Sequence, residues 1–208
     1  MLMHTGCAIL AGGEGSRLGG TPKGLIELGG ETLAERLIRL AAPLCSEIML
    51  ITNTPSLYAS MGVPIHPDDT PGRGPLEGIA TALRHSRSER ILVMACDMPL
   101  ISHTAMETLV AWQSSAEVVA PRSAKGLEPL FALYTQSALP AIEEYLSSGG
   151  RKIISAFKGL EVESLSEEIF DPQIWYNINE AIHLDELARI TGQIPSLHHE
   201  VLKKQHTG

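Results

Sequence analysis

Between Leu10 and Gly24 the sequence places six glycines around two cations, Arg17 and Lys23. Glycine tolerates positive φ and lets the backbone approach a ligand closely, so consecutive amides can converge on phosphate oxygens. Two cations at separate points of such a loop could grip different parts of a polyphosphate. Glycine-rich segments are also common as plain surface turns, so composition alone leaves both interpretations open.

Two common phosphate-binding loops do not match this stretch. A Walker A loop needs Gly-Lys-Ser/Thr, whereas Lys23 follows Pro22 and precedes Gly24. A dinucleotide-binding loop needs Gly-x-Gly-x-x-Gly, but Leu18 stands where the third glycine belongs. The stretch is therefore expected to hold phosphate by another arrangement.

A carboxylate, Asp97, follows the apolar run that ends at Ala95 and Cys96. Mg²⁺ prefers hard oxygen donors and bridges phosphates while it keeps several waters, so a carboxylate at the end of a buried strand suits it. A lone aspartate at a strand end more often caps the next helix. Both roles are possible for Asp97 on position alone.

Other polar residues lie in loops that could contact a ligand. Asn53 ends its own apolar run, where an Asx turn explains it equally well. Asp68 precedes a loop rich in glycine and proline, and Pro75 suits the first turn of the helix that follows. Arg151 and Lys152 form a small basic spot, for which solvated surface is the simpler interpretation.

The elements that must position these residues can be predicted from apolar spacing. Short apolar runs that stop at Gly, Asn, Pro or Asp predict buried strands over Cys7–Leu10, Glu47–Thr52, Arg90–Ala95 and Ala116–Ala120. Helical spacing predicts helices over Thr32–Ala42, Leu76–His85, Thr104–Ser114 and Ala181–Ile190. Thr32 and Glu35 have the spacing of a capping box at the start of the first helix.

This alternation predicts an α/β fold with a mostly parallel sheet between two helical layers, a three-layer αβα arrangement. Ligands of such sheets collect at the C-terminal ends of the strands. The loop after Leu10, the loop around Asn53 and the loop opened by Asp97 should therefore meet at one edge.

The whole chain limits the classes of function. Its 208 residues, 44% of them hydrophobic, fit one domain, expected over residues 1–195 and followed by a flexible tail over 196–208. A net charge of -8 argues against nucleic acid or an acidic membrane surface as partners. Three widely spaced cysteines fit a reducing cytoplasm, and the first apolar run is too short for a signal peptide or membrane span.

The stretch from Leu10 to Gly24 resembles the signature of nucleotidyltransferases with a Rossmann-like, glycosyltransferase-A type fold: Leu-Ala-Gly-Gly, then Ser-x-Arg-Met-Gly, then a lysine. Leu18 replaces the usual methionine. The continuation to Leu33, and Cys96-Asp97-Met98-Pro99, are most similar to the molybdenum cofactor guanylyltransferases. The nucleotide-binding residues then expected are Leu10, Ala11, Gly12, Gly13, Lys23, Asn53, Asp68 and Asp97.

The resemblance also bears on the choice of base. In that family an aspartate precedes Gly-Pro-Leu-x-Gly in a loop over the base and ribose, and Asp68 aligns with it best, with Asp69 one residue away. A carboxylate can accept from N1 and N2 of guanine, a donor pair that adenine lacks, so we interpret Asp68 as favouring GTP. For Asp97 the resemblance favours the Mg²⁺ ligand over the helix cap.

Two later segments resemble the acceptor side of the family. Glu128 and Pro129 stand where His or Glu followed by Pro-Leu is usual, and Asn177 and Asn179 resemble an Asn-x-Asn element. The two asparagines could ligate the metal or hold the acceptor phosphate, but capping of the following helix explains them nearly as well. With Arg151, these are the candidate acceptor-binding residues.

The resemblance implies transfer of GMP from GTP to molybdopterin, by in-line attack of the acceptor's terminal phosphate on the α-phosphorus with release of pyrophosphate. Arg17, Lys23 and Asp97, with Mg²⁺, would act by positioning and by offsetting charge. Transient contact with molybdoenzymes or other cofactor-biosynthesis proteins is implied as well. The alternatives are a cytidylyltransferase, a sugar-phosphate nucleotidyltransferase or a non-catalytic nucleotide-binding adaptor; Leu-Ala-Gly-Gly rather than Leu-Ala-Ala-Gly favours guanylyl transfer.

Overall fold

A computed structural model of the chain describes residues 4–12 and 20–197. Its main sheet has the strand order β10-β7-β9-β6-β1-β4-β5, with β8 paired to β7 alone. The strands are β1 Thr5–Leu10, β4 Glu47–Ile51, β5 Ile65–His66, β6 Arg90–Ala95, β7 Val118–Ser123, β8 Gly126–Leu127, β9 Phe131–Thr135 and β10 Val162–Leu165. Strands β6, β1, β4 and β5 are parallel, as are β7 and β10, whereas β9 runs antiparallel to both of its neighbours. The predicted mostly parallel sheet is confirmed.

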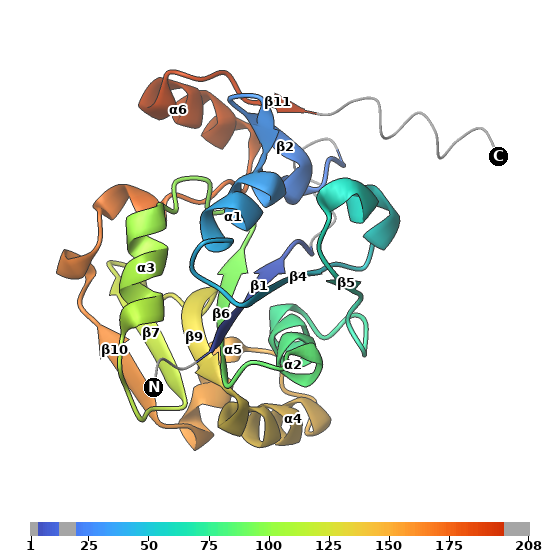
Figure 1. The fold of residues 1–208 in the computed structure, drawn as a ribbon, viewed down its shortest axis with the longest axis vertical. Coiled ribbons are helices and arrows are strands. Elements are labelled where there is room, and N and C mark those ends of the chain that lie inside the picture. Colours follow the sequence, from blue (N-terminus) through green and yellow to red (C-terminus); the bar gives the residue numbers. More distant parts are fainter. Residues whose placement is uncertain (1–3, 13–19, 198–208) are drawn as a thin grey trace.

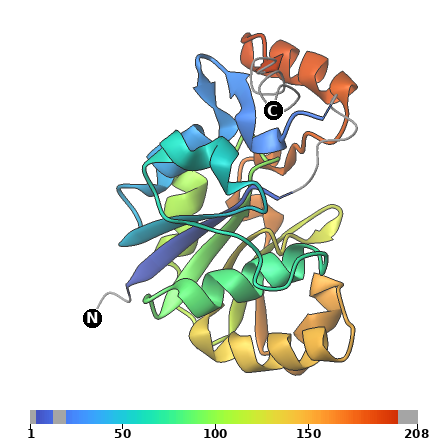
Figure 2. The ribbon, with the colours of Figure 1, turned by 90° about the vertical axis from the view of Figure 1, so that its right-hand side faces the viewer.

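Helices cover both faces of this sheet, which confirms the three layers (Figures 1 and 2). The helices are α1 Leu33–Ala41, α2 Pro75–His85, α3 His103–Ala111, α4 Leu139–Ser147, α5 Ile153–Ala156 and α6 Ala181–Thr191. Successive residues of a strand face opposite sides. In β1, Cys7 and Ile9 accordingly join the core beneath α1 and α3, while Ala8 and Leu10 join the core beneath α2, α4 and α5. This double burial explains why the strand has no polar alternation.

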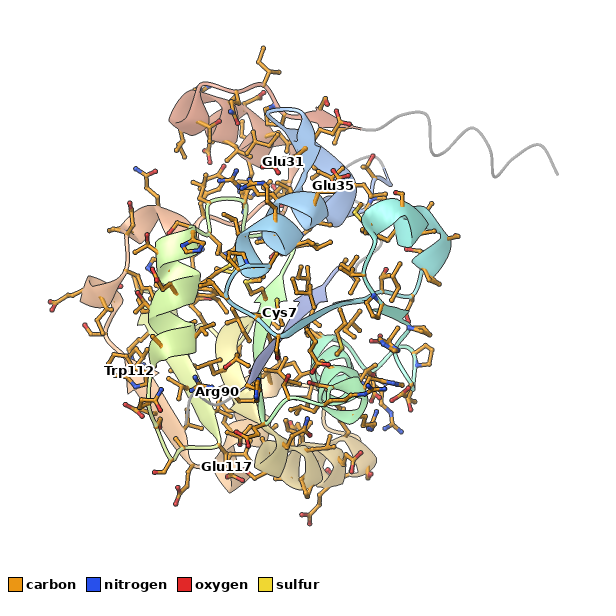
Figure 3. The ribbon with its side chains drawn as sticks, in the orientation of Figure 1. Cys7, Glu31, Glu35, Arg90, Trp112 and Glu117 are labelled. Carbon is orange, nitrogen blue, oxygen red and sulfur yellow. The ribbon has the colours of Figure 1, made fainter. Side chains whose placement is uncertain are left out.

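The limits of two helices have clear side-chain causes. At the start of α1, Thr32 and Glu35 form the predicted capping box (Glu35 is labelled in Figure 3). Helix α3 ends at Ala111, three residues before the predicted limit of Ser114. There the buried Arg90 donates to the carbonyls of Val110 and Trp112, the latter at 2.7 Å, at the end of α3 where Figure 3 labels Trp112. The guanidinium thus satisfies the last carbonyls of the helix.

A second, three-stranded sheet was not predicted. It has the antiparallel order β11-β2-β3, from β2 Ile26–Leu28, β3 Glu31–Thr32 and β11 Ser196–Leu197. With α6 it buries Ile26, Leu28, Leu33, Ile178 and Leu187, and it lies beyond the C-terminal ends of the central strands (Figure 1). Strand β11 contains the first two residues of the predicted tail, and 198–208 lie outside the described residues. Within the described ranges, no helix is long and apolar enough to cross a membrane.

Candidate active site

A cavity of about 400 Å³ opens at the C-terminal ends of β1, β4 and β6, where the sequence predicted that three loops meet. A volume of this order suits a nucleotide or cofactor fragment. Its lining residues are Leu10, Gly12, Lys23, Ile51, Asn53, Asp68, Gly72, Gly74, Pro75, Gly78, Ala95, Cys96, Asp97 and Leu130.

On one side of the cavity, the Lys23 ammonium joins three distant parts of the chain. Its Nζ donates to Asp97 Oδ2 at 3.0 Å and to Asn179 Oδ1 at 2.7 Å. The backbone N–H of Ile178 donates to the carbonyl of Asp97 at 2.8 Å, which holds the segment before α6 against the end of β6. A carboxylate oxygen and an amide oxygen therefore converge on one cation.

The cap of α6 explains why Asn179 can face this cation. The N-cap of the helix is Glu180, and His183 Nδ1 accepts from the backbone N–H groups of Asn179 and Glu180, each at 3.0 Å. Asn177 Nδ2 donates to the carbonyl of Trp175 at 3.2 Å. The asparagine side chains do not cap the helix, so the Asn179 amide is left to bind Lys23.

A second polar pair lies on the other side of β1. Asn53 Nδ2 donates to Asp68 Oδ2 at 2.8 Å, and the Asp68 backbone N–H donates to Asn53 Oδ1 at 3.0 Å. Burial raises the pKa of Asp68; the bond from Asn53 lowers it, and the charges of Glu77 and Asp69 raise it further, so the net pKa lies above the ordinary value. Asp69 turns away from the cavity toward Arg84, which assigns Asp68 as the carboxylate of this wall.

The Lys23 cluster and the Asn53–Asp68 pair make the two ends of the cavity chemically different, and we call this difference its polarity. Asn53 follows β4 and Asp97 follows β6, with β1 between them, so they are about 10 Å apart along the sheet edge at ordinary strand spacing. The cation Lys23 lies on the β6 side, and the acceptor-rich pair Asn53 and Asp68 on the β4 side. A ligand with an anionic end and an end that donates hydrogen bonds would match this order.

The oxygen donors around Lys23 also bear on metal binding. No group of three or more His, Cys, Asp or Glu is placed to hold a metal ion among residues 4–12 and 20–197. Asp97 and Asn179 instead supply two hard oxygens around a position that already holds a positive charge. Such a partial set fits Mg²⁺, which takes its remaining ligands from water and substrate phosphates.

The turn that carries Lys23 is packed tightly enough to require a glycine. A Cβ on Gly24 would lie 2.8 Å from Tyr58 Oη. Tyr58 is fully buried, and its hydroxyl has no hydrogen-bond partner among the described residues. A side chain at position 24 would therefore push the Lys23–Leu25 turn off a rigid ring.

We expect Gly24→Ala to destabilise the fold by about 1–3 kcal/mol, the usual cost of overpacking a core. Tyr58→Phe removes an unpaired buried hydroxyl and should cost little or stabilise. It should also reduce the cost of the alanine in the double variant, since it removes the closest atom. Urea unfolding of the four proteins measures this, and equal stability of Gly24→Ala and the parent would contradict the packing argument.

The remaining predicted residues are placed as follows. Glu128 Oε1 accepts from Ser123 Oγ at 2.5 Å, and the carbonyl of Pro129 accepts from a tyrosine hydroxyl at 2.7 Å. Neither residue lines the cavity, although the next residue, Leu130, does. Arg151 is exposed before α5, also outside the lining. Ala11 is buried beside the lining residues Leu10 and Gly12, whereas Gly13 and Arg17 lie outside the described residues.

Sequence reasoning missed part of the lining. Ile51 and Ala95 end strands that were predicted, and Cys96 directly follows the second of them, so the rule about strand ends could have included all three. Gly72 and Gly74 belong to the recognised glycine-rich loop and Gly78 to the first turns of α2, but no local signal tells which of them faces a ligand.

Comparison with known proteins points to one family. A family model described as MobA-like NTP transferase domain matches residues 7–162. The chain is 34% identical to a protein of Carboxydothermus hydrogenoformans named "Probable molybdenum cofactor guanylyltransferase", over 88% of this chain and 94% of that one. It is 31% identical to the "Molybdenum cofactor guanylyltransferase" of Desulfosudis oleivorans, over 86% and 91%.

Among solved structures, the chain is similar to molybdopterin-guanine dinucleotide biosynthesis protein A from Archaeoglobus fulgidus, with a TM-score of 0.78 and 26% identity. The match covers 90% of this chain and 98% of that one.

Proposed function

The chain belongs to the MobA-like NTP transferase family, and we propose that it is a molybdenum cofactor guanylyltransferase, which transfers GMP from GTP to molybdopterin and releases pyrophosphate. The observation that carries this proposal is the polarity of the cavity. Lys23, with Asp97 and Asn179, suits the triphosphate, and the pair of Asn53 and Asp68 suits the base.

The proposed reaction requires no covalent intermediate with the protein. The acceptor's terminal phosphate is already a nucleophile, so no strong general base is needed, and rate enhancement rests on alignment and on offsetting charge. When GTP binds, the hydrogen bond of Lys23 to Asp97 would weaken, and the ammonium would donate to phosphate oxygens near Gly12. Mg²⁺ held by Asp97 and Asn179 would offset negative charge on the triphosphate. Arg17 is proposed as a second cation for the phosphates.

The base end would select guanine through Asp68. Its carboxylate can accept from guanine N1–H and N2–H, while Asn53 holds it through the amide at 2.8 Å. Adenine and cytosine do not offer this donor pair, so with them the carboxylate would keep the bond from Asn53 but lose the paired bonds from the base.

We expect Asp68→Ala to reduce the preference for GTP over ATP by about tenfold to a hundredfold in kcat/KM, the scale of one or two lost hydrogen bonds. The kcat with GTP should change far less, because the phosphate end is untouched. Steady-state rates with both nucleotides measure this, and the ATP rate of the same variant is the internal control. A variant that rejects ATP as well as the parent does would remove Asp68 from base selection.

The acceptor is proposed to approach beside Leu130, with Glu128, Pro129, Arg151 and Asn177 as candidate contacts. Transient contact with the molybdoenzymes that receive the product, and a cytoplasmic location, belong to the same proposal.

The test of the proposed function is a nucleotide panel with Mg²⁺ and molybdopterin, in which pyrophosphate release is followed with GTP, CTP, ATP and UTP. Release with GTP alone supports guanylyl transfer. Preference for CTP would move the chain to cytidylyl transfer, and no release with any nucleotide would favour another acceptor or a non-catalytic adaptor.

A further inference from the structure

The loop of residues 68–74, between β5 and α2, forms the base-side wall of the cavity and contributes Asp68, Gly72 and Gly74. Gly72 and Gly74 adopt positive φ, 85° and 76°. Two such glycines give a free loop many accessible conformations, so ordering it has an entropic cost. The contacts that restrain this loop therefore decide where Asp68 points.

The two neighbouring aspartates of the loop make contacts in opposite directions. Asp68 pairs with Asn53 at the cavity, whereas Asp69 Oδ2 accepts from Arg84 Nη1 at 2.8 Å. The Asp69 backbone N–H donates to Thr81 Oγ1 of α2 at 3.2 Å. With Asp69 fixed on α2 by these two bonds, its neighbour Asp68 is held at the cavity wall, where it pairs with Asn53.

Arg84 joins the loop to two helices. Its Nη1 also lies 2.9 Å from Glu77 Oε1 in the first turn of α2, and its Nε lies 2.8 Å from Glu143 Oε1 on α4. Burial lowers the pKa of Arg84, but its bonds to Glu143, Glu77 and Asp69 raise the pKa more, so the net pKa is raised. The planar guanidinium serves several carboxylates at fixed angles, which a lysine ammonium does not do equally well.

Glu77 is the buried partner of this arginine. Its side chain is 0% exposed, and its Oε2 has no hydrogen-bond partner among the described residues, lying 3.9 Å from Arg73 Nη1. A buried carboxylate is costly unless it is paired, so Glu77 restricts where the Arg84 guanidinium can lie. The charge of Glu77 also raises the pKa of Asp68. Asp68 lies at the end of the cavity that should receive hydrogen-bond donors rather than phosphate.

We propose that Arg84 and Glu77 are positioning residues that fix the 68–74 loop, aim Asp68 at the nucleotide base and thereby set nucleotide choice. This inference rests on the proposed function, since it needs a base in the cavity. Neither residue lines the cavity, so Arg84 would act through Asp69 and the loop, and Glu77 through Arg84.

The test compares binding of GTP and ITP to the full-length protein with Mg²⁺ by calorimetry. The hypoxanthine of ITP lacks the exocyclic N2 amine, so the ratio of the two dissociation constants measures the contact that Asp68 would make. In Arg84→Ala the ratio should fall by about tenfold, the value of one hydrogen bond. Arg84→Lys and Glu77→Gln should give smaller reductions, and kcat at saturating GTP should stay within about twofold because the phosphate end is intact.

The matched control is Glu143→Ala, which removes the contact of Arg84 to α4 but leaves Asp69 and Glu77 paired. It should keep the parent ratio. If Arg84→Ala does not fold, Arg84→Lys and Glu77→Gln provide the measurement. A parent protein that binds GTP and ITP alike would contradict the proposed base selection itself. A discriminating parent with unchanged ratios in the variants, whatever their melting temperatures, would overturn the positioning role alone.

Discussion

Lys23→Ala is expected to lower the rate of pyrophosphate release by about a hundredfold to a thousandfold at saturating GTP and Mg²⁺, the range for removal of one charge-stabilising donor from an active site. Lys23 is the cation that the described part of the cavity wall presents, and its ammonium is already 2.7 Å and 3.0 Å from two oxygens. The effect should fall on kcat, because the ammonium would meet charge that grows as the pyrophosphate leaves.

The fold should survive this change. Lys23 and Asp97 are 19% and 25% exposed, and partly exposed ion pairs contribute on the order of 1 kcal/mol or less to stability. Lys158→Ala, at an exposed lysine outside the cavity lining, is the control and should keep parent activity. Equal rates for the Lys23→Ala variant and the parent, with matching circular dichroism, would exclude Lys23 from catalysis.

Asp97→Asn is expected to lower turnover by about a thousandfold, since loss of several kcal/mol of charge stabilisation corresponds to that factor. The amide oxygen can still accept from Lys23, and the Asp97 backbone contact to Ile178 is unaffected, so the local geometry should persist. What the substitution removes is the negative charge of a hard oxygen ligand.

A second readout separates metal binding from other roles of Asp97. Binding of Mn²⁺ in the presence of GTP, followed by electron paramagnetic resonance, should weaken in Asp97→Asn and stay unchanged in Asp185→Asn, at an exposed aspartate of α6. Lost turnover with unchanged Mn²⁺ binding would show that Asp97 acts on Lys23 or substrate and would reject it as the metal ligand.

Sequence reasoning succeeded where the determining interactions are local or periodic. The apolar run of β6, the helix limits of α2 and the capping box of α1 depend on residues within a few positions of one another. The position of Asp97 in the cavity followed from one rule on strand ends. The same local signal placed the end of α3 wrongly, because Arg90 of a central strand caps it.

Features that depend on distant contacts could not be predicted. The antiparallel direction of β9 is set by its neighbours β6 and β7, and the small sheet joins residues near positions 27 and 196. Asp68 lines the cavity while Asp69 pairs with Arg84, 15 residues further along the chain, a contact that no local pattern reveals. Lys23 and Asn179, 156 residues apart, share no pattern that would reveal their contact.

The separation of 156 residues between Lys23 and Asn179 limits how early in folding the candidate active site can form. A loop that spans 156 of the 208 residues must close before Asn179 reaches Lys23, and the contact of Ser196 with Glu27 spans 169 residues. Contacts between residues far apart in the sequence form slowly, because the entropy lost in closing the long loop precedes the stabilisation that the contact provides. The base-side wall, whose Asn53 and Asp68 are only 15 residues apart, can form early. If the proposed roles hold, a chain emerging during synthesis can form the Asn53–Asp68 pair before Lys23 can meet Asn179, because the second contact needs the segment that leads into α6.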